Sequence, residues 1–393
     1  MFVDQGLAEF SDLAYKTAVV VYLVALAVSL FFYGQMKMAT DVRRQRSEFI
    51  SKARRDAAGA SGAAGGGGST TAGSDAAGSG EGSGSSVATA VTTATATATA
   101  HPGTGDAGTG EPPVASGDAG DIVEEDLPPH LHIDMIRRRF RRADSTGGMA
   151  QALVWLAVAL HIAFVVLRGL AAQRFPWGNL FEYIAVVSMV AMIIACAVIR
   201  RRSMRVMWPW ILTPIVLLLF YSGTELYADV APVVPSLKSN WYWIHVSTVS
   251  VGGGIGLVSG MASLMYLLRR SQPKGKEKGV FGAIATPLPD AAKLDALAYR
   301  AGIWTLPVFG LGIVFGAIWA HFAWDRFWGW DPKETVSFIT WILYAAYLHA
   351  RATPGMRGRF AAVINVLAFA TMVFNLFFIN MVVSGLHSYA GLN

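Results

Sequence analysis

Residues 17–35 read TAVVVYLVALAVSLFFYGQ, a run without a charged side chain. About 20 apolar residues in a row can cross the hydrocarbon core of a bilayer as a helix, so this run predicts a membrane span. Seven further apolar runs follow along the chain, at residues 149–170, 180–199, 207–222, 243–268, 301–320, 335–350 and 360–383. With 53% hydrophobic residues, the chain is predicted to be an all-α polytopic membrane protein with about eight transmembrane helices.

Lys and Arg residues are concentrated in alternate loops between these runs. Short loops rich in Lys and Arg stay in the cytoplasm, so the alternation orients the chain in the cell membrane. The basic loops contain Arg43, Arg44, Arg46, Arg137, Arg138, Arg139, Arg141, Arg142, Arg200, Arg201, Arg202, Arg205, Arg269, Arg270, Lys274, Lys276, Lys278, Arg351, Arg357 and Arg359. This pattern predicts that both termini lie outside. It also explains the formal net charge of +6, and we expect no nucleic-acid partner.

The first 147 residues differ in character from the rest. Residues 1–36 are predicted to be a retained membrane anchor, because basic residues follow the apolar run. Residues 37–147 are expected to form a cytoplasmic linker, rich in Ala, Gly, Ser and Thr from about Asp56 to Gly120, which cannot bury a core and is predicted to be disordered. The end of this linker is acidic and then basic, and docking of a partner is an alternative role. Residues 148–393 hold the other seven predicted helices, without an evident internal repeat.

The chain contains one cysteine, Cys196, inside a predicted span. This excludes a disulfide framework, a Cys-x-x-Cys redox pair and an iron–sulfur site built by this chain alone. The sequence also lacks a Gly-rich phosphate loop, a His-Glu-x-x-His zinc motif and a Ser nucleophile elbow. Hydrolases and nucleotide-driven transporters are therefore disfavoured.

Aromatic residues are concentrated in one region, where residues 324–334 read WDRFWGWDPKE. Eight of the 12 Trp residues lie between residues 241 and 341. An aromatic belt at the membrane interface is one explanation. The close spacing of Trp324, Trp328 and Trp330 around a glycine also suits a folded loop whose rings hold a large flat ligand.

Two helix starts can be read from capping residues. Asp331 is predicted to be an N-cap, followed by proline, with Glu334 reaching back to the cap amide. Asn179 and Glu182 have the same spacing and predict a second capped helix. Helix initiation alone is a sufficient explanation for each group.

Four histidines are informative because of their predicted depth in the membrane. His245 and His387 lie at the outer ends of two spans, on the predicted side of the Trp-rich loop. Two imidazoles beside aromatic rings are the groups that hold a haem, with His on the iron. His349 is near the inner end of a span and is a functional candidate. His161, midway along another span, is interpreted as a packed, hydrogen-bonded residue.

The chain resembles the CcsA/ResC family of haem-handling proteins, also called CcsB in some bacteria, of system II cytochrome c maturation. The resemblance covers about residues 150–393 well and the first predicted span loosely. It rests on FWGWDPKET at residues 327–335, ITWILYAAYLH at 339–349, PWGNLFE at 176–182, YWIH at 242–245 and GLHSY at 385–389. Asp325 and Arg326 depart from the family pattern, in which small residues are expected.

This resemblance implies a haem b site on the outer face, built on a loop at about residues 321–334 that is the family's WWD domain. Trp324, Trp328, Trp330 and Asp331 would contribute to it. The resemblance further implies His245 and His387 as axial ligands and His349 as an inner haem ligand. His321, close to the loop, is a competing candidate for the iron.

The implied function is transfer of haem across the membrane for thioether attachment to Cys-x-x-Cys-His apocytochromes c. The chain would be a component of a cytochrome c synthase, or haem lyase, with a CcsB/ResB-type membrane subunit and a thiol-reducing partner. The alternatives are a haem exporter or chaperone without ligase activity, a membrane cytochrome b, and a purely structural subunit.

Overall fold

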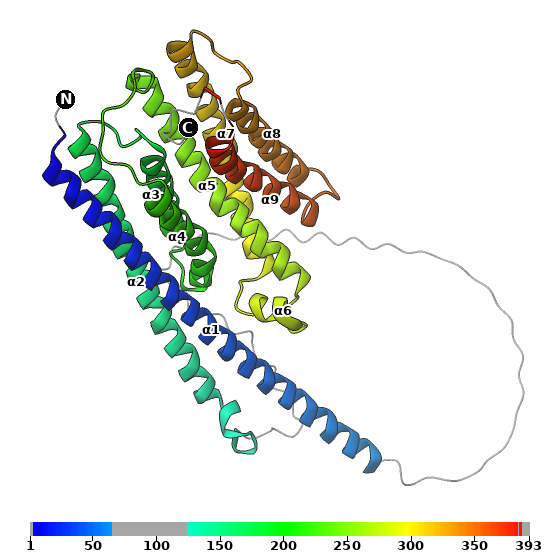
Figure 1. Cartoon of the computed structure of the whole chain (residues 1–393). Coiled ribbons are helices and arrows are strands. Elements are labelled where there is room, and N and C mark those ends of the chain that lie inside the picture. The colour runs from blue at the N-terminus through cyan, green and yellow to red at the C-terminus, as the bar shows by residue number, and fades with distance from the viewer. Residues whose placement is uncertain (1–2, 65–123, 384, 387–393) are drawn as a thin grey trace, which may run out of the picture. The chain divides into compact units, whose positions relative to one another are not determined.

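The computed structural model describes residues 3–64, 124–383 and 385–386. The regular elements in these residues are helical, which confirms the predicted all-α class (Figure 1). The long helices are α1 (Gln5–Ala64), α2 (Ile133–Ala172), α3 (Leu180–Val198), α4 (Trp208–Glu225), α5 (Asn240–Ser271), α7 (Ala291–Trp324), α8 (Pro332–Ala352) and α9 (Arg359–Phe374). The shorter elements are α6 (Gly279–Ala285), the 3-10 turns Glu124–Asp126, Pro129–Leu131, Arg202–Met207 and Pro235–Lys238, and a π-helical turn, Asn375–Ile379, that continues α9.

Each predicted apolar run lies largely within one of these long helices. Within the described residues, seven helical segments are long and apolar enough to cross a membrane: α1 to α5, α7, and α9 with its π-helical turn. The chain is therefore a polytopic helical membrane protein. The predicted span at 335–350 is helical in α8, but it is not among the seven. Polar residues such as Thr335, Thr340 and His349 lower its hydropathy.

The described chain divides into two units. The helical bundle comprises Met1–Arg46 and Pro128–Asn393, and the second unit, Ser47–Leu127, contains the last part of α1. Helix extends further into the predicted linker than expected, because α1 continues to Ala64 and α2 already begins at Ile133. Both extensions are rich in Arg, and that of α1 is also rich in Ala, and these residues favour helix even where no membrane is crossed. Residues 65–123 of the predicted linker lie outside the described residues.

The bundle has two chemically different ends. The α2–α3 and α7–α8 loops lie at one end, which we call the Trp-loop end. The Asp4 amide donates to Ala171 O (3.2 Å), and the Leu386 amide donates to Asp331 Oδ1 (2.9 Å), so both described ends of the bundle's chain lie there (Figure 1). This agrees with the prediction that the two termini share one side.

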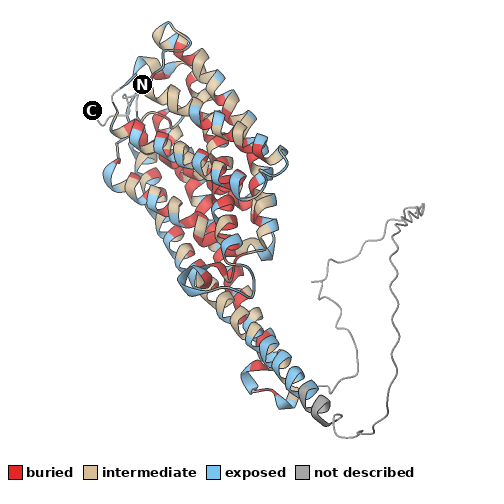
Figure 2. Ribbon diagram, turned by 90° about the vertical axis from the view of Figure 1, so that its right-hand side faces the viewer, coloured by how far each residue is buried: buried red, intermediate tan, exposed pale blue. Residues whose placement is uncertain are grey.

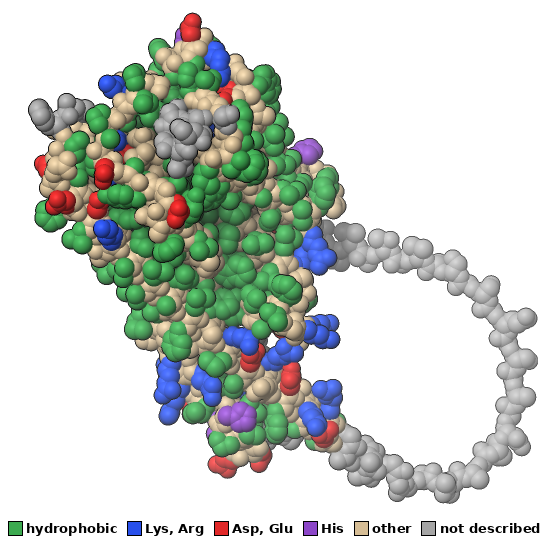
Figure 3. All heavy atoms as spheres, viewed as in Figure 1, with side chains coloured by type: hydrophobic (Ala, Val, Ile, Leu, Met, Phe, Trp, Pro, Cys, Tyr) green, Lys and Arg blue, Asp and Glu red, His purple; other side chains and the backbone are tan. Residues whose placement is uncertain are grey.

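Basic side chains gather at the opposite end of the bundle, as alternation of the basic loops predicts (Figure 3). There Glu277 accepts hydrogen bonds from Arg269 (3.0 Å) and Arg44 (3.3 Å). Burial alone would raise the pKa of Glu277, but hydrogen bonds from Arg269 and backbone amides outweigh it and lower the pKa. These contacts hold the end of α5 to α1 and to the loop before α6.

Helix α5 is in the interior of the bundle, where buried residues are concentrated (Figure 2), and it contacts α3, α7 and α9. Its contact with α7 depends on small residues, which let helix backbones approach closely in membranes. A Cβ on Gly252 would lie 2.9 Å from the backbone of Phe309. A Cβ on Gly312 of α7 would lie 2.6 Å from Val249. The same contact holds His245 of α5 against α7.

We expect Gly252→Ala to destabilise the bundle by about 1–3 kcal/mol, since the added methyl group meets backbone atoms that cannot rotate away. Thermal unfolding of the purified chain in detergent measures this loss. Gly34→Ala in α1 is the matched control, because a Cβ there has no heavy atom within 4 Å. Equal midpoints for the two variants would show that the α5–α7 contact is looser than described.

Candidate functional site

Two loops at the Trp-loop end have the same construction. Loop A, residues 173–179, joins α2 to α3, and loop B, residues 325–331, joins α7 to α8. Each begins with a left-handed residue that ends the preceding helix, Gln173 (φ 48°) or Asp325 (φ 53°). Each then continues with Arg-Phe, a glycine, and an Asn or Asp that caps the next helix. This likeness is a short repeat that was not predicted from the sequence.

In loop B, the Glu334 carboxylate holds the backbone in place. It accepts hydrogen bonds from the amides of Gly329 (2.9 Å) and Asp331 (3.2 Å) and from the Arg326 guanidinium (3.1 Å). The Asp331 side chain in turn accepts from the Lys333 amide (3.3 Å), so the predicted capping box is present. A Cβ on Gly329 would lie 2.1 Å from the Arg326 guanidinium, so a larger residue there would displace the arginine from Glu334.

In loop A, Glu182 plays the corresponding part and is fully buried. It accepts hydrogen bonds from the Gly178 amide (2.7 Å), Arg174 (2.7 Å) and Arg168 (3.0 Å). Asn179 caps α3 through the Glu182 amide (2.9 Å), which confirms the predicted cap. Glu182 therefore does more than initiate a helix, because its charge balances two buried or half-buried guanidinium groups.

We call the Arg326–Glu334 and Arg174–Glu182 pairs the two Arg–Glu clamps. Arg326 departs from the small residue that the family pattern led us to expect, and the clamp gives the reason for an arginine there. Asp325 tolerates the left-handed conformation better than most residues with a side chain.

A cavity of about 930 Å³ extends from both loops into the bundle, between α3, α4, α5, α7 and α9. This is near the upper end of the range for small-molecule sites, about 300–1,000 Å³. Trp177 of loop A, Trp324 at the end of α7 and Trp328 of loop B all border it. Deeper in the bundle its walls are mainly aliphatic and aromatic, with Leu257 and Phe369 among the lining residues.

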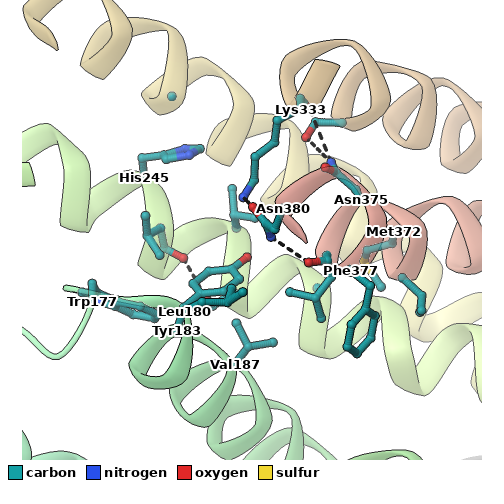
Figure 4. Close-up of a pocket in the computed structure, with 18 of the residues that line it drawn as sticks. Trp177, Leu180, Tyr183, Val187, His245, Lys333, Met372, Asn375, Phe377 and Asn380 are labelled. Carbon is teal, nitrogen blue, oxygen red and sulfur yellow. Dashed lines mark hydrogen bonds between the residues drawn. The ribbon is translucent and has the colours of Figure 1, made fainter. Parts of the chain in front are cut away.

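His245 faces this cavity from α5 (Figure 4). Its Nδ1 lies 2.7 Å from the Gly312 carbonyl oxygen. Since a carbonyl can only accept, Nδ1 donates, and the neutral ring then has its lone pair on Nε2. The ring stacks on Trp319 at 5.9 Å, and Gly316 leaves room for it, because a Cβ there would lie 2.7 Å from the ring. The ring orientation is thus fixed in a form able to bind a metal.

Sequence reasoning missed several polar residues at the cavity, among them Lys333, Asn375 and Asn380 (Figure 4). Lys333 was interpreted only as part of a helix start. Its ammonium group donates to Asn380 Oδ1 and lies 5.6 Å from the centre of the Tyr183 ring. The two asparagines interrupt the apolar run at 360–383, which was the available signal.

The structure brings only some of the predicted site residues together. His245, Trp324 and Trp328 line the cavity. Trp330 does not: it is 67% exposed, at φ 56°, and its ring meets Trp328 edge-on at 5.7 Å. Asp331 is buried as the cap of α8 and is not among the lining residues.

The other histidines that the structure describes are not among the residues that line the cavity. His321 stacks on Phe327 (4.5 Å), which lines the cavity, but His321 itself does not line it, and His349 is exposed on α8. His161 is fully buried, with Nδ1 3.4 Å from the Tyr22 hydroxyl, in agreement with a packed, hydrogen-bonded residue. His387 lies outside the described residues.

The fold and the site define a multi-pass helical membrane protein whose Trp-rich loop borders an apolar cavity containing a histidine. Residues 149–387 match the family described as cytochrome C assembly protein. The chain belongs to this family, which confirms the resemblance found in its sequence.

Individual relatives support the same conclusion. Cytochrome c biogenesis protein CcsA of Guillardia theta is 31% identical over 242 residues, covering 58% of this chain and 80% of the relative. CcsA of Parasynechococcus marenigrum (strain WH8102) is 32% identical over 273 residues, covering 62% and 86%. CcsA of Chlamydomonas reinhardtii is 36% identical over 163 residues, covering 42% and 44%.

We expect Glu334→Ala to loosen loop B, because the Gly329 and Asp331 amides and Arg326 lose their shared acceptor. The loss of about 1–3 kcal/mol corresponds to amide exchange roughly 5- to 150-fold faster across residues 326–331. Hydrogen exchange followed by mass spectrometry measures it. Glu225→Ala, an exposed carboxylate at the cavity rim, is the control. Unchanged exchange in loop B would mean that other contacts hold it.

Proposed function

We propose that this chain binds haem in the cavity at the Trp-loop end and presents it for covalent attachment to apocytochromes c. Membership of the cytochrome c assembly family assigns the chain to cytochrome c biogenesis. The observation that carries the finer proposal is His245. Its hydrogen bond to Gly312 O favours the tautomer with a lone pair on Nε2, at an apolar cavity large enough for a cofactor-sized ligand.

Each part of the cavity has a role in this proposal. His245 binds the haem iron as one axial ligand, which is the usual use of an imidazole in such sites. Trp324 and Trp328 contact the porphyrin, and the aliphatic walls exclude water from it. Trp330 and Asp331 act indirectly, since one faces outward beside Trp328 and the other caps the helix that follows loop B.

His387 is proposed as the second axial ligand. The described chain leads to it through Leu386, whose amide is bound by the Asp331 side chain in loop B. An incoming Cys-x-x-Cys-His segment would displace one imidazole from the iron while its thiols react with the haem vinyl groups. The contribution of this chain to that reaction is positioning, which can account for large rate effects.

We propose that the haem site lies on the outer face of the membrane and that haem arrives from the cytoplasmic side by way of His349. Since His349 is exposed and does not line the cavity, a second membrane subunit would have to complete a site there. This supports the proposal of a CcsB/ResB-type partner, with which this chain would form a cytochrome c synthase. A thiol-reducing partner would keep the apocytochrome cysteines reactive.

A haem exporter or chaperone without ligase activity would use the same cavity, and thioether formation on a coexpressed apocytochrome distinguishes the two. A membrane cytochrome b is disfavoured, since it would hold haem between histidines within the spans. Among the described lining residues, His245 is the one histidine.

Replacing His245 with glycine should lower haem affinity about tenfold or more, because the iron loses a protein ligand. Free imidazole should restore binding, since it fits the vacated space. Haem content and the absorption spectrum of the purified chain measure both effects. His321→Gly is the matched control, and full haem with an unchanged spectrum in His245→Gly would overturn the assignment of the ligand.

Cysteine labelling tests the outer location of the site. Ser236→Cys, at the Trp-loop end, should react with a membrane-impermeant maleimide in intact cells, whereas Ser271→Cys at the end of α5 should react only after lysis. The native Cys196 is buried and gives little background. The reverse pattern would place the cavity entrance on the cytoplasmic side.

A further inference from the structure

Lys333 has an unusual position for a lysine. It lies in the first turn of α8, where the positive end of the helix dipole disfavours a cation. Its side chain points into the cavity, toward α9 and α3, and not into solvent (Figure 4). A positive charge at this position destabilises the helix, so its presence points to a role of Lys333 in the cavity.

The charge of Lys333 is solvated by neutral groups. Its ammonium group donates to Asn380 Oδ1 and lies over the face of Tyr183. The Asn380 amide nitrogen donates to Leu376 O (2.7 Å), which turns the side-chain oxygen toward the lysine. These contacts orient the ammonium group but supply no negative charge.

Neighbouring carboxylates make other contacts. Glu334 binds Arg326 and two loop amides, and Asp331 accepts from the backbone amides of Lys333 and Leu386. Among the described residues, no carboxylate forms an ion pair with the Lys333 ammonium group. A largely buried cation usually has an anionic partner, because removing it from water is costly. Asp331 acts on the ammonium group through space, without an ion-pair contact, so a carboxylate of a ligand can supply the direct contact.

The rest of the cavity restricts the chemistry of that ligand. Its walls are mostly apolar, so the ligand is a large apolar body with an acidic group at one edge. Haem has this form, with two propionate carboxylates on one edge of a flat ring. Lys333 and His245 project into the same cavity from different helices, so one ligand can engage both (Figure 4).

We propose that Lys333 binds a propionate carboxylate of the haem whose iron is held by His245, and so selects one orientation of the ring in its plane. This inference rests on the proposed function of the cavity. The vinyl edge lies opposite the propionate edge, so the Lys333 contact also determines where the reactive vinyl groups lie. Lys333 is a specificity-determining residue and takes no part in bond formation.

The test compares two probes, iron protoporphyrin IX and its dimethyl ester, titrated into the purified full-length chain and followed by the Soret band. Lys333→Met should weaken binding of the free acid about 10- to 100-fold, the loss expected for a charge-assisted hydrogen bond. Binding of the ester should change by about twofold or less, since the ester has no anionic carboxylate for the lysine. Lys333→Arg should restore much of the preference for the acid.

Lys238→Met is the matched control, because Lys238 is exposed at the same end of the bundle and does not line the cavity. It should bind both probes as the wild type does. The ester also reports folding: a Lys333→Met chain that binds it with an unchanged Soret position has an intact cavity and iron ligand. If that variant does not fold, Lys333→Gln, which also removes the charge but keeps a polar side chain, is titrated with both probes in its place, and the same loss of preference for the acid is expected.

Two results would overturn the inference in distinguishable ways. If the wild type and Lys333→Met bind both probes with the same ratio of affinities, Lys333 does not contact a propionate, although the cavity still binds haem. If the wild type binds neither probe and His245→Gly behaves identically, the proposed function fails together with the inference.

Discussion

The arrangement of the site depends on a carboxylate at the third position of a helix, bound by an arginine eight residues earlier. Glu334 and Glu182 both bind a guanidinium group and the amide of a loop glycine. Charge-assisted hydrogen bonds of this kind are stronger than neutral ones and restrict both partners in direction. They fix the loop and the first turn of the next helix as one unit. The two ion pairs therefore stabilise the loops that form the cavity walls at the Trp-loop end.

The two clamps act on the same cavity through different helices. The clamp under loop B fixes α8, which directs Lys333 into the cavity, and the clamp under loop A fixes α3, which carries Tyr183 beneath that lysine. His245 is fixed separately, by the close contact of α5 with α7 at Gly312 and Gly316. Backbone packing thus orients the imidazole, and buried electrostatics orients the cation. A ligand that needs both groups meets a preorganised site, which lowers the entropy lost on binding.

The sequence predicted the helices well because a membrane span is defined by length and hydropathy, and both can be read locally. His245 was singled out by its depth in a predicted span and Trp328 by its close spacing with other tryptophans, and both line the cavity. The polar extensions of α1 and α2 were missed because they obey helix propensity and not hydropathy. The directions of the Lys333 and Trp330 side chains could not be predicted from the sequence. Whether a side chain next to a helix start faces a cavity or the surface depends on tertiary packing that spacing alone does not specify.

Loops A and B contain the same Arg–Glu clamp but differ in how far their tryptophans are exposed. Loop A is closed inward: Trp177 is buried, and Arg168 adds contacts to Asp12 and to the Ala228 carbonyl. Loop B has no corresponding second arginine among its described contacts, and its left-handed Trp330 turns the ring outward beside Trp328. The tryptophan of loop A is therefore buried in the bundle, whereas loop B exposes the aromatic ring of Trp330 at the surface. Because each clamp is local to its own loop and helix start, loop B can expose its rings without loosening α8, and the cavity keeps its shape while one side remains accessible.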